Sequence, residues 1–105
     1  MKQYDIILVN LDPTLGSETK KTRPCVIISP DEMNDNLKTL VIAPMTTQSK
    51  NYPTRVEVFH QNVTGYVVID QIRTIDKKRV IKKLDILSSS EIQTVKDVIE
   101  ETFVK

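Results

Sequence analysis

Cysteine, histidine and tryptophan are nearly absent from this chain of 105 residues, which has one Cys, one His and no Trp. A single cysteine excludes an intrachain disulfide, and one His with one Cys cannot form the usual structural zinc site. Cys25 lies in the apolar run 25–28, which predicts a small buried side chain and not a catalytic thiol. We therefore expect no metal and no cofactor.

Long apolar runs are also missing. No segment is long and apolar enough to cross a membrane, and the N-terminus lacks the apolar core and cleavage site of a signal peptide. These absences predict a cytoplasmic protein with no membrane partner. The length fits one domain over residues 1–105.

Charge gives little guidance at the level of the whole chain, because the formal net charge is +1. Lysine and arginine do cluster locally, at 20–23 and at 77–83. Such clusters either bind nucleic acid or lie on solvated turns, and charge alone favours the turns.

Short apolar runs between polar breaks predict a mainly β protein. The expected strands cover 6–11, 25–29, 40–43, 55–59, 66–69, 72–75 and 80–81. A long polar loop is expected at 14–22, a helical turn at 31–36 and a chain break at Gly65.

Only the C-terminus has a helical pattern. Ser88 and Glu91 have the spacing of a capping box, which satisfies free amides at a helix start. One helical face then carries Ile92, Val95, Val98, Ile99 and Phe103. The face either packs on the sheet or binds a partner, and packing is favoured. Together the pattern predicts a small, strongly bent β-barrel with a C-terminal helix.

Three sequence strings suggest a family. They are DPTLGSE at 12–18 followed by TRP at 22–24, APMTTQSK at 43–50 followed by YP at 52–53, and DQIRTID at 70–76. In this order and spacing they resemble the MazF/PemK family of toxin–antitoxin ribonucleases, and the resemblance covers nearly the whole chain.

The resemblance has several implications. It implies a small SH3-like β-barrel of the CcdB/PemK type with a C-terminal helix, assembled as a homodimer. It implies a sequence-specific endoribonuclease that cleaves single-stranded RNA, such as mRNA, without a metal ion. It also implies a MazE-like antitoxin whose acidic, flexible tail occupies the RNA groove.

Metal-free RNA cleavage uses the ribose 2′-hydroxyl as nucleophile, and it needs a proton acceptor, a proton donor and groups that stabilise the extra negative charge. Arg23 matches the family's catalytic arginine, and its guanidinium can hold two phosphate oxygens. Thr46 matches the catalytic threonine, expected to follow the third strand and to donate a hydrogen bond. Glu18 is the candidate base, or else a solvated loop acid.

Further residues are expected to bind RNA by stacking, hydrogen bonding or charge. They are Ser17, Thr19, Lys20, Lys21, Thr47, Gln48, Ser49, Lys50, Tyr52, Asp70 and Arg73. Asp70 also matches an aspartate of PemK-type sites, but Val68 replaces the arginine of those sites and Ser17 replaces their basic loop residue. The MazF version of the site therefore fits better.

Other interpretations remain. His60 has the pKa range of a general base, but it is interpreted as a surface histidine that follows a strand. A non-enzymatic, gyrase-poisoning toxin of the CcdB class shares the fold, but it does not need Arg23 and Thr46 together. An SH3-like module for proline-rich peptides would need more aromatic residues than the 5% found here.

Overall fold

The computed structural model describes residues 1–11, 21–48 and 52–105. Its strands are β1 (Asp5–Asn10), β2 (Thr22–Ile27), β3 (Thr39–Thr46), β4 (Arg55–Phe59), β5 (Thr64–Val68), β6 (Arg73–Asp76) and β7 (Val80–Ile86). Its helices are α1 (Asp31–Asn36), α2 (Ser89–Ile99), the short 3-10 turns η1 (Ile69–Gln71) and η2 (Lys77–Arg79), and the π-helical end η3 (Glu100–Val104).

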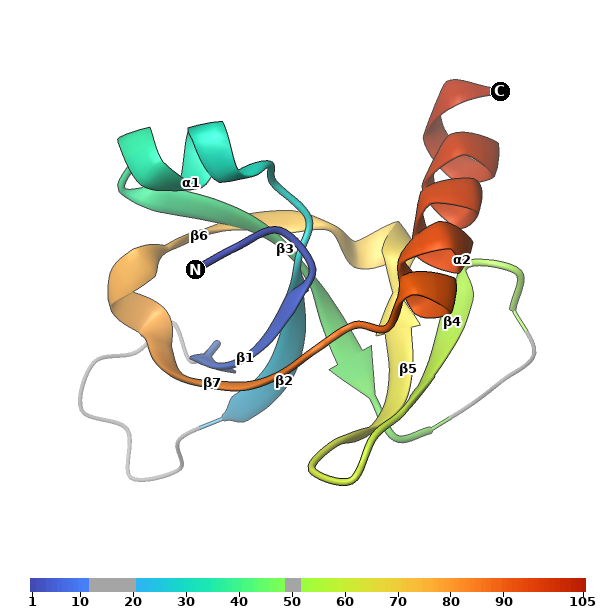
Figure 1. Cartoon of the computed structure of the whole chain (residues 1–105), viewed down its shortest axis with the longest axis horizontal. Coiled ribbons are helices and arrows are strands. Elements are labelled where there is room, and N and C mark those ends of the chain that lie inside the picture. The colour runs from blue at the N-terminus through green and yellow to red at the C-terminus, as the bar shows by residue number, and fades with distance from the viewer. Residues whose placement is uncertain (12–20, 49–51) are drawn as a thin grey trace.

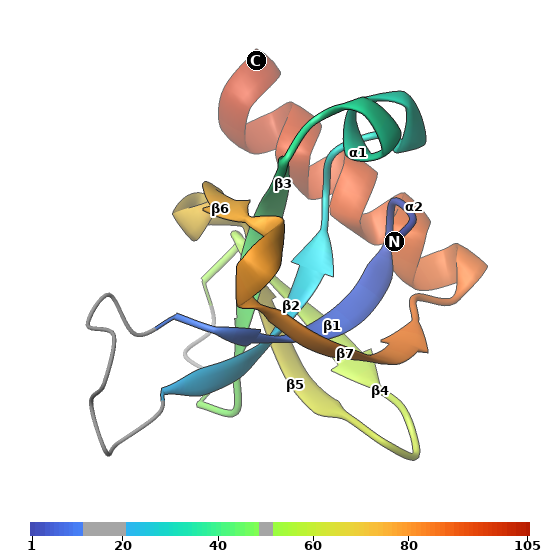
Figure 2. The same cartoon turned by 90° about the vertical axis from the view of Figure 1, so that its left-hand side faces the viewer.

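The strands form one strongly curled antiparallel sheet with the order β4-β5-β3-β2-β1-β7 (Figure 1). β3 pairs with β2 along one edge, while its other edge pairs first with β6 and then with β5. Because β3 serves two partners in succession, the sheet bends around it (Figure 2). This confirms the expected mainly β fold with a C-terminal helix.

Alternate residues of the central strands point into two separate cores, so the sheet is buried on both faces. One core contains Ile6, Val26, Ala43 and Val67, and it is covered by α2 through Val95. The other core contains Ile7, Val9, Cys25, Ile27, Leu40, Ile42 and Ile75. The near-continuous apolar runs of β1 and β2 follow from this two-sided burial.

Helix α2 begins as the sequence predicts. Ser88 Oγ accepts a hydrogen bond from the Glu91 amide, and Glu91 Oε1 accepts one from the Ser88 amide, which completes the capping box. Ile92, Val98 and Ile99 pack against the core together with the buried Val95. The expectation for Phe103 was wrong, because the chain becomes π-helical before this residue and its side chain is 58% exposed.

Several expected boundaries were wrong. β3 continues through Pro44 to Thr46, so Thr46 ends the strand instead of following it. β7 is longer than the expected 80–81, whereas β5 ends at Val68 because Ile69 begins η1. Gly65 lies inside β5 and does not break the chain.

Candidate functional site

Arg23 and Thr46 come from adjacent strands at the same end of the sheet. β2 and β3 pair Ile27 with Ile42 and Cys25 with Pro44. Continuing this register by two residues along each strand brings Arg23 opposite Thr46. The arginine lies near the start of β2 and its side chain is exposed, which suits contact with a substrate.

The two residues line two open hollows on the surface. Hollow A has a volume of about 380 Å³ and is lined by Arg23, Thr46, Gln48, Tyr52, Arg55, Val68 and Gln71. Hollow B has a volume of about 410 Å³ and is lined by Thr22, Arg23, Pro24, Met45, Thr46, Thr47 and Gln48. The structure therefore brings Arg23 together with Thr46 and Gln48, which lie more than 20 residues further along the chain.

Thr46 is held by its neighbours in the sheet. Its Oγ1 accepts a hydrogen bond of 3.3 Å from the Gln48 amide, which leaves the hydroxyl hydrogen available for another acceptor. Its strand pairs with β5, where Tyr66 lies opposite. A Cβ atom on Gly65 would lie 2.7 Å from the Thr46 carbonyl oxygen, so β5 reaches this position only because residue 65 has no side chain.

Both hollows carry positive charge from arginine side chains. Arg23 and Arg55 line hollow A, and none of the described residues that line either hollow is Asp, Glu or His. Such a surface attracts an anionic ligand. The proposed base Glu18 lies outside the described residues, as do Ser17, Thr19, Lys20, Ser49 and Lys50.

Only some of the other expected RNA-binding residues line the hollows. Gln48 and Tyr52 line hollow A, and Thr47 lines hollow B together with a third hollow that contains Phe59. The exposed side chains of Lys21, Asp70 and Arg73 line none of these hollows.

Three lining residues of hollow A, namely Arg55, Val68 and Gln71, were not among the RNA-binding residues expected from the sequence. Arg55 begins β4, and its guanidinium carbon lies 5.6 Å from the centre of the Tyr52 ring. Its place at the site follows from the pairing of β4 with β5, in which Arg55 lies opposite Val68. This pairing places β4 beside the string at 70–76.

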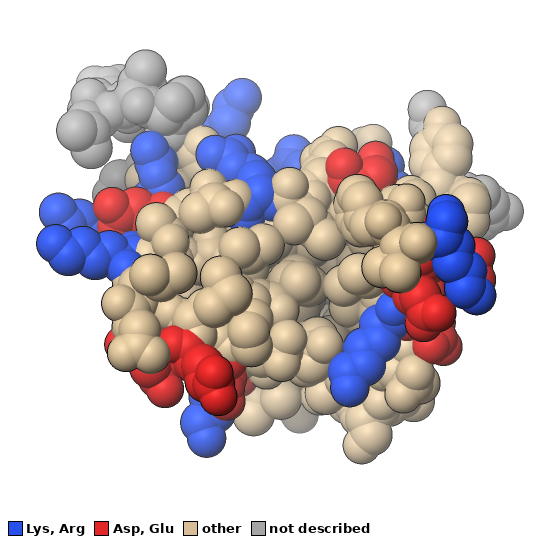
Figure 3. Space-filling view, turned by 90° about the horizontal axis from the view of Figure 1, so that it is seen from above, with Lys and Arg blue, Asp and Glu red and all other residues tan. Residues whose placement is uncertain are grey.

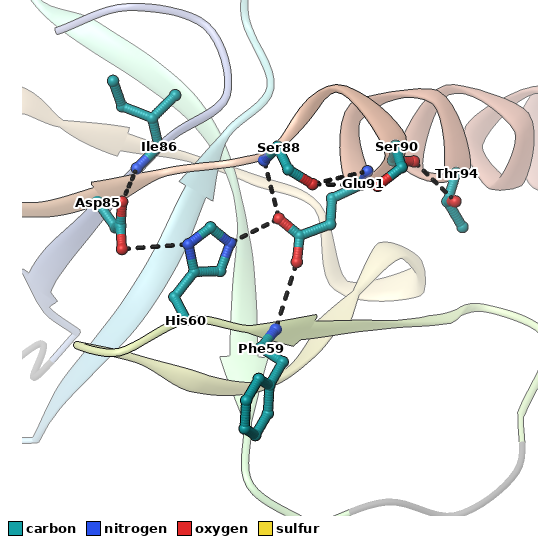
Figure 4. Close-up of polar contacts among 8 residues, drawn as sticks. All are labelled: Phe59, His60, Asp85, Ile86, Ser88, Ser90, Glu91 and Thr94. Carbon is teal, nitrogen blue, oxygen red and sulfur yellow. Dashed lines mark hydrogen bonds and ion pairs between the residues drawn. The ribbon is translucent and has the colours of Figure 1, made fainter.

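His60 has a role that the sequence did not reveal. Its Nδ1 lies 3.1 Å from Asp85 Oδ2 and its Nε2 lies 2.6 Å from Glu91 Oε1 (Figure 4). The hydrogen bond to Glu91 raises the His60 pKa, and both carboxylates add to this effect, although burial opposes it. The interpretation as a surface histidine was therefore wrong, because the side chain is only 15% exposed and is bound on both sides.

Cys25 is fully buried, as expected. Burial raises the pKa of its thiol to about 12, although Arg23 and Arg73 act in the opposite direction. Within the described ranges, no three His, Cys, Asp or Glu side chains are grouped so that they could hold a metal ion. The helices in this same part of the chain are too short or too polar to span a bilayer.

Comparison with known proteins adds a family assignment to this geometry. A family model described as "PemK-like, MazF-like toxin of type II toxin-antitoxin system" matches residues 2–103. The chain is 37% identical over 93 residues to the Endoribonuclease toxin MazF of Escherichia coli K12, covering 88% of this chain and 84% of the relative. It is 33% identical over 106 residues to the Endoribonuclease MazF of Staphylococcus saprophyticus, covering 95% and 88%.

Solved structures share the fold. MazF from Deinococcus radiodurans superposes with a TM-score of 0.84 at 22% identity and covers 100% of this chain and 97% of the other. An endoribonuclease from a mycobacterial species, solved in complex with its cognate antitoxin, has a TM-score of 0.86 at 19% identity and covers 99% and 95%.

Proposed function

Because the chain belongs to the PemK/MazF family of type II toxins, we propose that it is an endoribonuclease that cleaves single-stranded RNA within a short recognition sequence. The observation that carries the proposal is that Arg23 and Thr46 line the same two hollows. We propose mRNA as the substrate of this endoribonuclease, and the cytoplasm as the place where it acts. The relatives are described as endoribonucleases, so they give no support to the gyrase-poisoning alternative.

The proposed reaction needs no metal. The ribose 2′-oxygen attacks the adjacent phosphorus, the P–O5′ bond breaks, and the products carry a 2′,3′-cyclic phosphate and a 5′-hydroxyl. The 2′-hydroxyl proton passes to a base, and the departing 5′-oxygen receives a proton. Glu18 is our candidate for the base, because the described residues that line the hollows include no carboxylate or imidazole.

Arg23 and Thr46 stabilise the transition state in this proposal. The Arg23 guanidinium faces the two non-bridging phosphate oxygens, where the extra negative charge develops. The Thr46 hydroxyl donates one hydrogen bond to the same group, while its oxygen accepts from the Gln48 amide. An arginine retains its proton at neutral pH, so Arg23 supplies charge and orientation and not proton transfer.

We also propose an antitoxin partner. A mycobacterial endoribonuclease of this fold was solved in complex with its cognate antitoxin, and MazF of Deinococcus radiodurans was solved together with MazE. Arginines line hollows A and B, and none of the described lining residues is acidic, so an acidic flexible tail of a MazE-like antitoxin could occupy the hollows in place of RNA phosphates.

A homodimer is the proposed assembly. The face from which α1 and the C-terminal end of α2 project has a broad area without charged side chains, bordered by charges (Figure 3). Exposed apolar residues belong to the elements on this side, including Met33 of α1 and Phe103 and Val104 of η3. An uncharged area with a charged border is typical of a subunit interface.

The test is to map cleavage of a long mixed-sequence RNA in excess chelator. We expect cuts at one short sequence, with cyclic phosphate and 5′-hydroxyl ends. Cleavage that disappears with chelator and returns with Mg²⁺ would refute the metal-free mechanism. Inhibition of DNA gyrase without any RNA cleavage would instead support the alternative toxin class.

A further inference from the structure

Arg55 presents an unsatisfied donor at the wall of hollow A. Its Nε is buried, and no described residue accepts a hydrogen bond from it. Arginine remains charged at every physiological pH, so a buried N–H of this group without a partner is unfavourable. Buried polar atoms in folded proteins are nearly always paired, and an exception calls for an explanation such as a ligand.

Tyr52 holds the arginine in a defined orientation. The guanidinium carbon lies 5.6 Å from the centre of the Tyr52 ring, within the range of a cation–π contact. A contact of this kind uses the face of the guanidinium, so the edge formed by its two terminal nitrogens, unlike the buried Nε, remains for a ligand in hollow A. That edge presents parallel donors, which match two adjacent acceptor atoms on one ligand group.

The position of Arg55 relates it to the proposed cleavage site. Arg55 lines hollow A together with Arg23 and Thr46, and none of the described lining residues carries negative charge. The hollow therefore contains one arginine assigned to the reacting phosphate and a second without an assigned role.

We propose that Arg55, supported by Tyr52, binds a second group of the RNA, adjacent to the nucleotide that is cleaved. The group offers two neighbouring acceptors, which both a phosphate and the O6/N7 edge of guanine provide. The inference rests on the proposed endoribonuclease function. It adds a residue that determines substrate affinity and, if the group is a base, the recognition sequence.

The first experiment measures steady-state cleavage by Arg55→Lys and Arg55→Gln. Lysine retains the charge but loses the two-point donor geometry, whereas glutamine retains much of the side-chain length. We expect KM to rise about tenfold or more in both variants, with kcat changed much less, because the contact also forms in the ground state. Tyr52→Ala should also raise KM, because it removes the ring that lies against the guanidinium.

Matched controls separate binding from general charge and folding. Lys96→Ala removes one exposed positive charge from α2, at a residue that lines neither hollow, and it should leave KM unchanged. A thermal melt of each variant identifies any loss of the folded protein. Normal melting together with wild-type KM in both Arg55 variants would overturn the proposal.

A second experiment distinguishes the two sources of acceptors. Oligonucleotides carry one neutral methylphosphonate linkage, or one base replacement, at successive positions around the cut. One of these substrate changes removes the group that Arg55 binds. With that substrate, wild type and Arg55→Lys should have the same KM, which cancels the difference between them. Cancellation by a methylphosphonate identifies a phosphate, and cancellation by a base replacement identifies guanine. Absence of cancellation at every position would contradict the inference.

Failure of the proposed function is distinguishable from failure of this inference. Binding is measured with an RNA that carries a 2′-deoxyribose at the cut site, which cannot react. If the wild-type protein cleaves no RNA but loses affinity for this probe on Arg55→Lys, the catalytic proposal fails and the Arg55 site stands. If the wild type cleaves and binding is unaffected by the substitution, only the Arg55 site fails.

Discussion

Nε2 of His60 lies 2.6 Å from Oε1 of Glu91, and this contact joins the end of β4 to the first turn of α2. On its other side the same ring contacts Asp85 in β7. β4 and β7 are the two terminal strands of the sheet path, so His60 closes the curled sheet with side chains where no backbone pairing is present in the described residues.

We expect His60→Ala to destabilise the protein. The substitution removes two partly buried hydrogen bonds and leaves Asp85 and Glu91 facing each other without a cation. Hydrogen bonds to charged groups contribute about 1.5–3 kcal/mol each to stability, so the loss of two should cost about 3 kcal/mol or more. Urea unfolding measures the change, and Gln61→Ala, at the exposed neighbouring residue, is the control. Equal stability of His60→Ala and wild type would show that the closure contributes nothing.

The same cluster predicts a pH dependence of stability. The His60 pKa is raised from 6.5, so its contribution is complete below pH 6.5 and disappears as pH rises through the folded-state pKa. Burial acts to raise the Glu91 pKa, but hydrogen bonds from Ser88, His60 and Phe59 outweigh it and lower the value from 4.5. The Glu91 contribution is therefore complete above pH 4.5 and disappears at lower pH.

The measurement is the difference in unfolding free energy between wild type and His60→Gln across a pH series. The difference should be largest between about pH 4.5 and 6.5 and should decrease on both sides. A difference that increases above pH 7 would contradict the assigned charge on His60.

Substitutions of Arg23 and Thr46 should lower cleavage without unfolding the protein. Arg23→Ala should lower the cleavage rate on the order of a hundredfold or more, because it removes charge from the transition state. Arg23→Lys should stay low, since lysine lacks the two-point grip, and Thr46→Ala should have the smaller effect of one lost hydrogen bond. Both positions are at strand ends, so the free energy of unfolding should change by under about half a kcal/mol in each variant. A folded Arg23→Ala protein with normal cleavage would refute the site.

Gly65→Ala tests how β5 supports Thr46. The new methyl group would lie 2.7 Å from the Thr46 carbonyl oxygen, and backbone atoms cannot move aside as a flexible side chain can. We expect β5 to shift, with a loss of about 1–3 kcal/mol in stability and lower cleavage in the protein that remains folded. Thr64→Ala, at the exposed preceding residue, is the control. Unchanged cleavage and melting would show that β3 and β5 accommodate the added methyl group without a loss.

Inhibition by an acidic tail should depend on salt. A glutamate-rich synthetic peptide should raise the apparent KM for RNA, and the effect should weaken as ionic strength rises, because exposed charges are screened. The arginines of hollows A and B are the expected contacts. If peptide and RNA bind simultaneously and independently, direct competition is wrong.

Much of the fold is predictable from local patterns. The alternation in β4 and the capping box of α2 fix those elements through short-range geometry. The end of β3 was not predictable, because Pro44 normally stops a strand. Here Pro44 falls between the segment paired with β6 and the segment paired with β5, where a missing N–H is tolerated.

The site was predictable only in part. Arg23 and Thr46 were identified by their strings, and the register of β2 and β3 then explains why they meet. Arg55 was missed because nothing in a single strand shows which strand lies beside it. His60 was misinterpreted for the same reason, since its partner Glu91 is 31 residues away.

The buried thiol of Cys25 has a practical consequence for these measurements. It is the only cysteine of the chain, and with a pKa of about 12 almost none of it is the reactive thiolate at neutral pH. A maleimide dye added to the folded protein should therefore leave Cys25 unmodified. A cysteine introduced at an exposed position, such as Thr64→Cys, would then carry the only fluorophore. The natural chain thus already provides the unreactive background that fluorescence studies of RNA binding need.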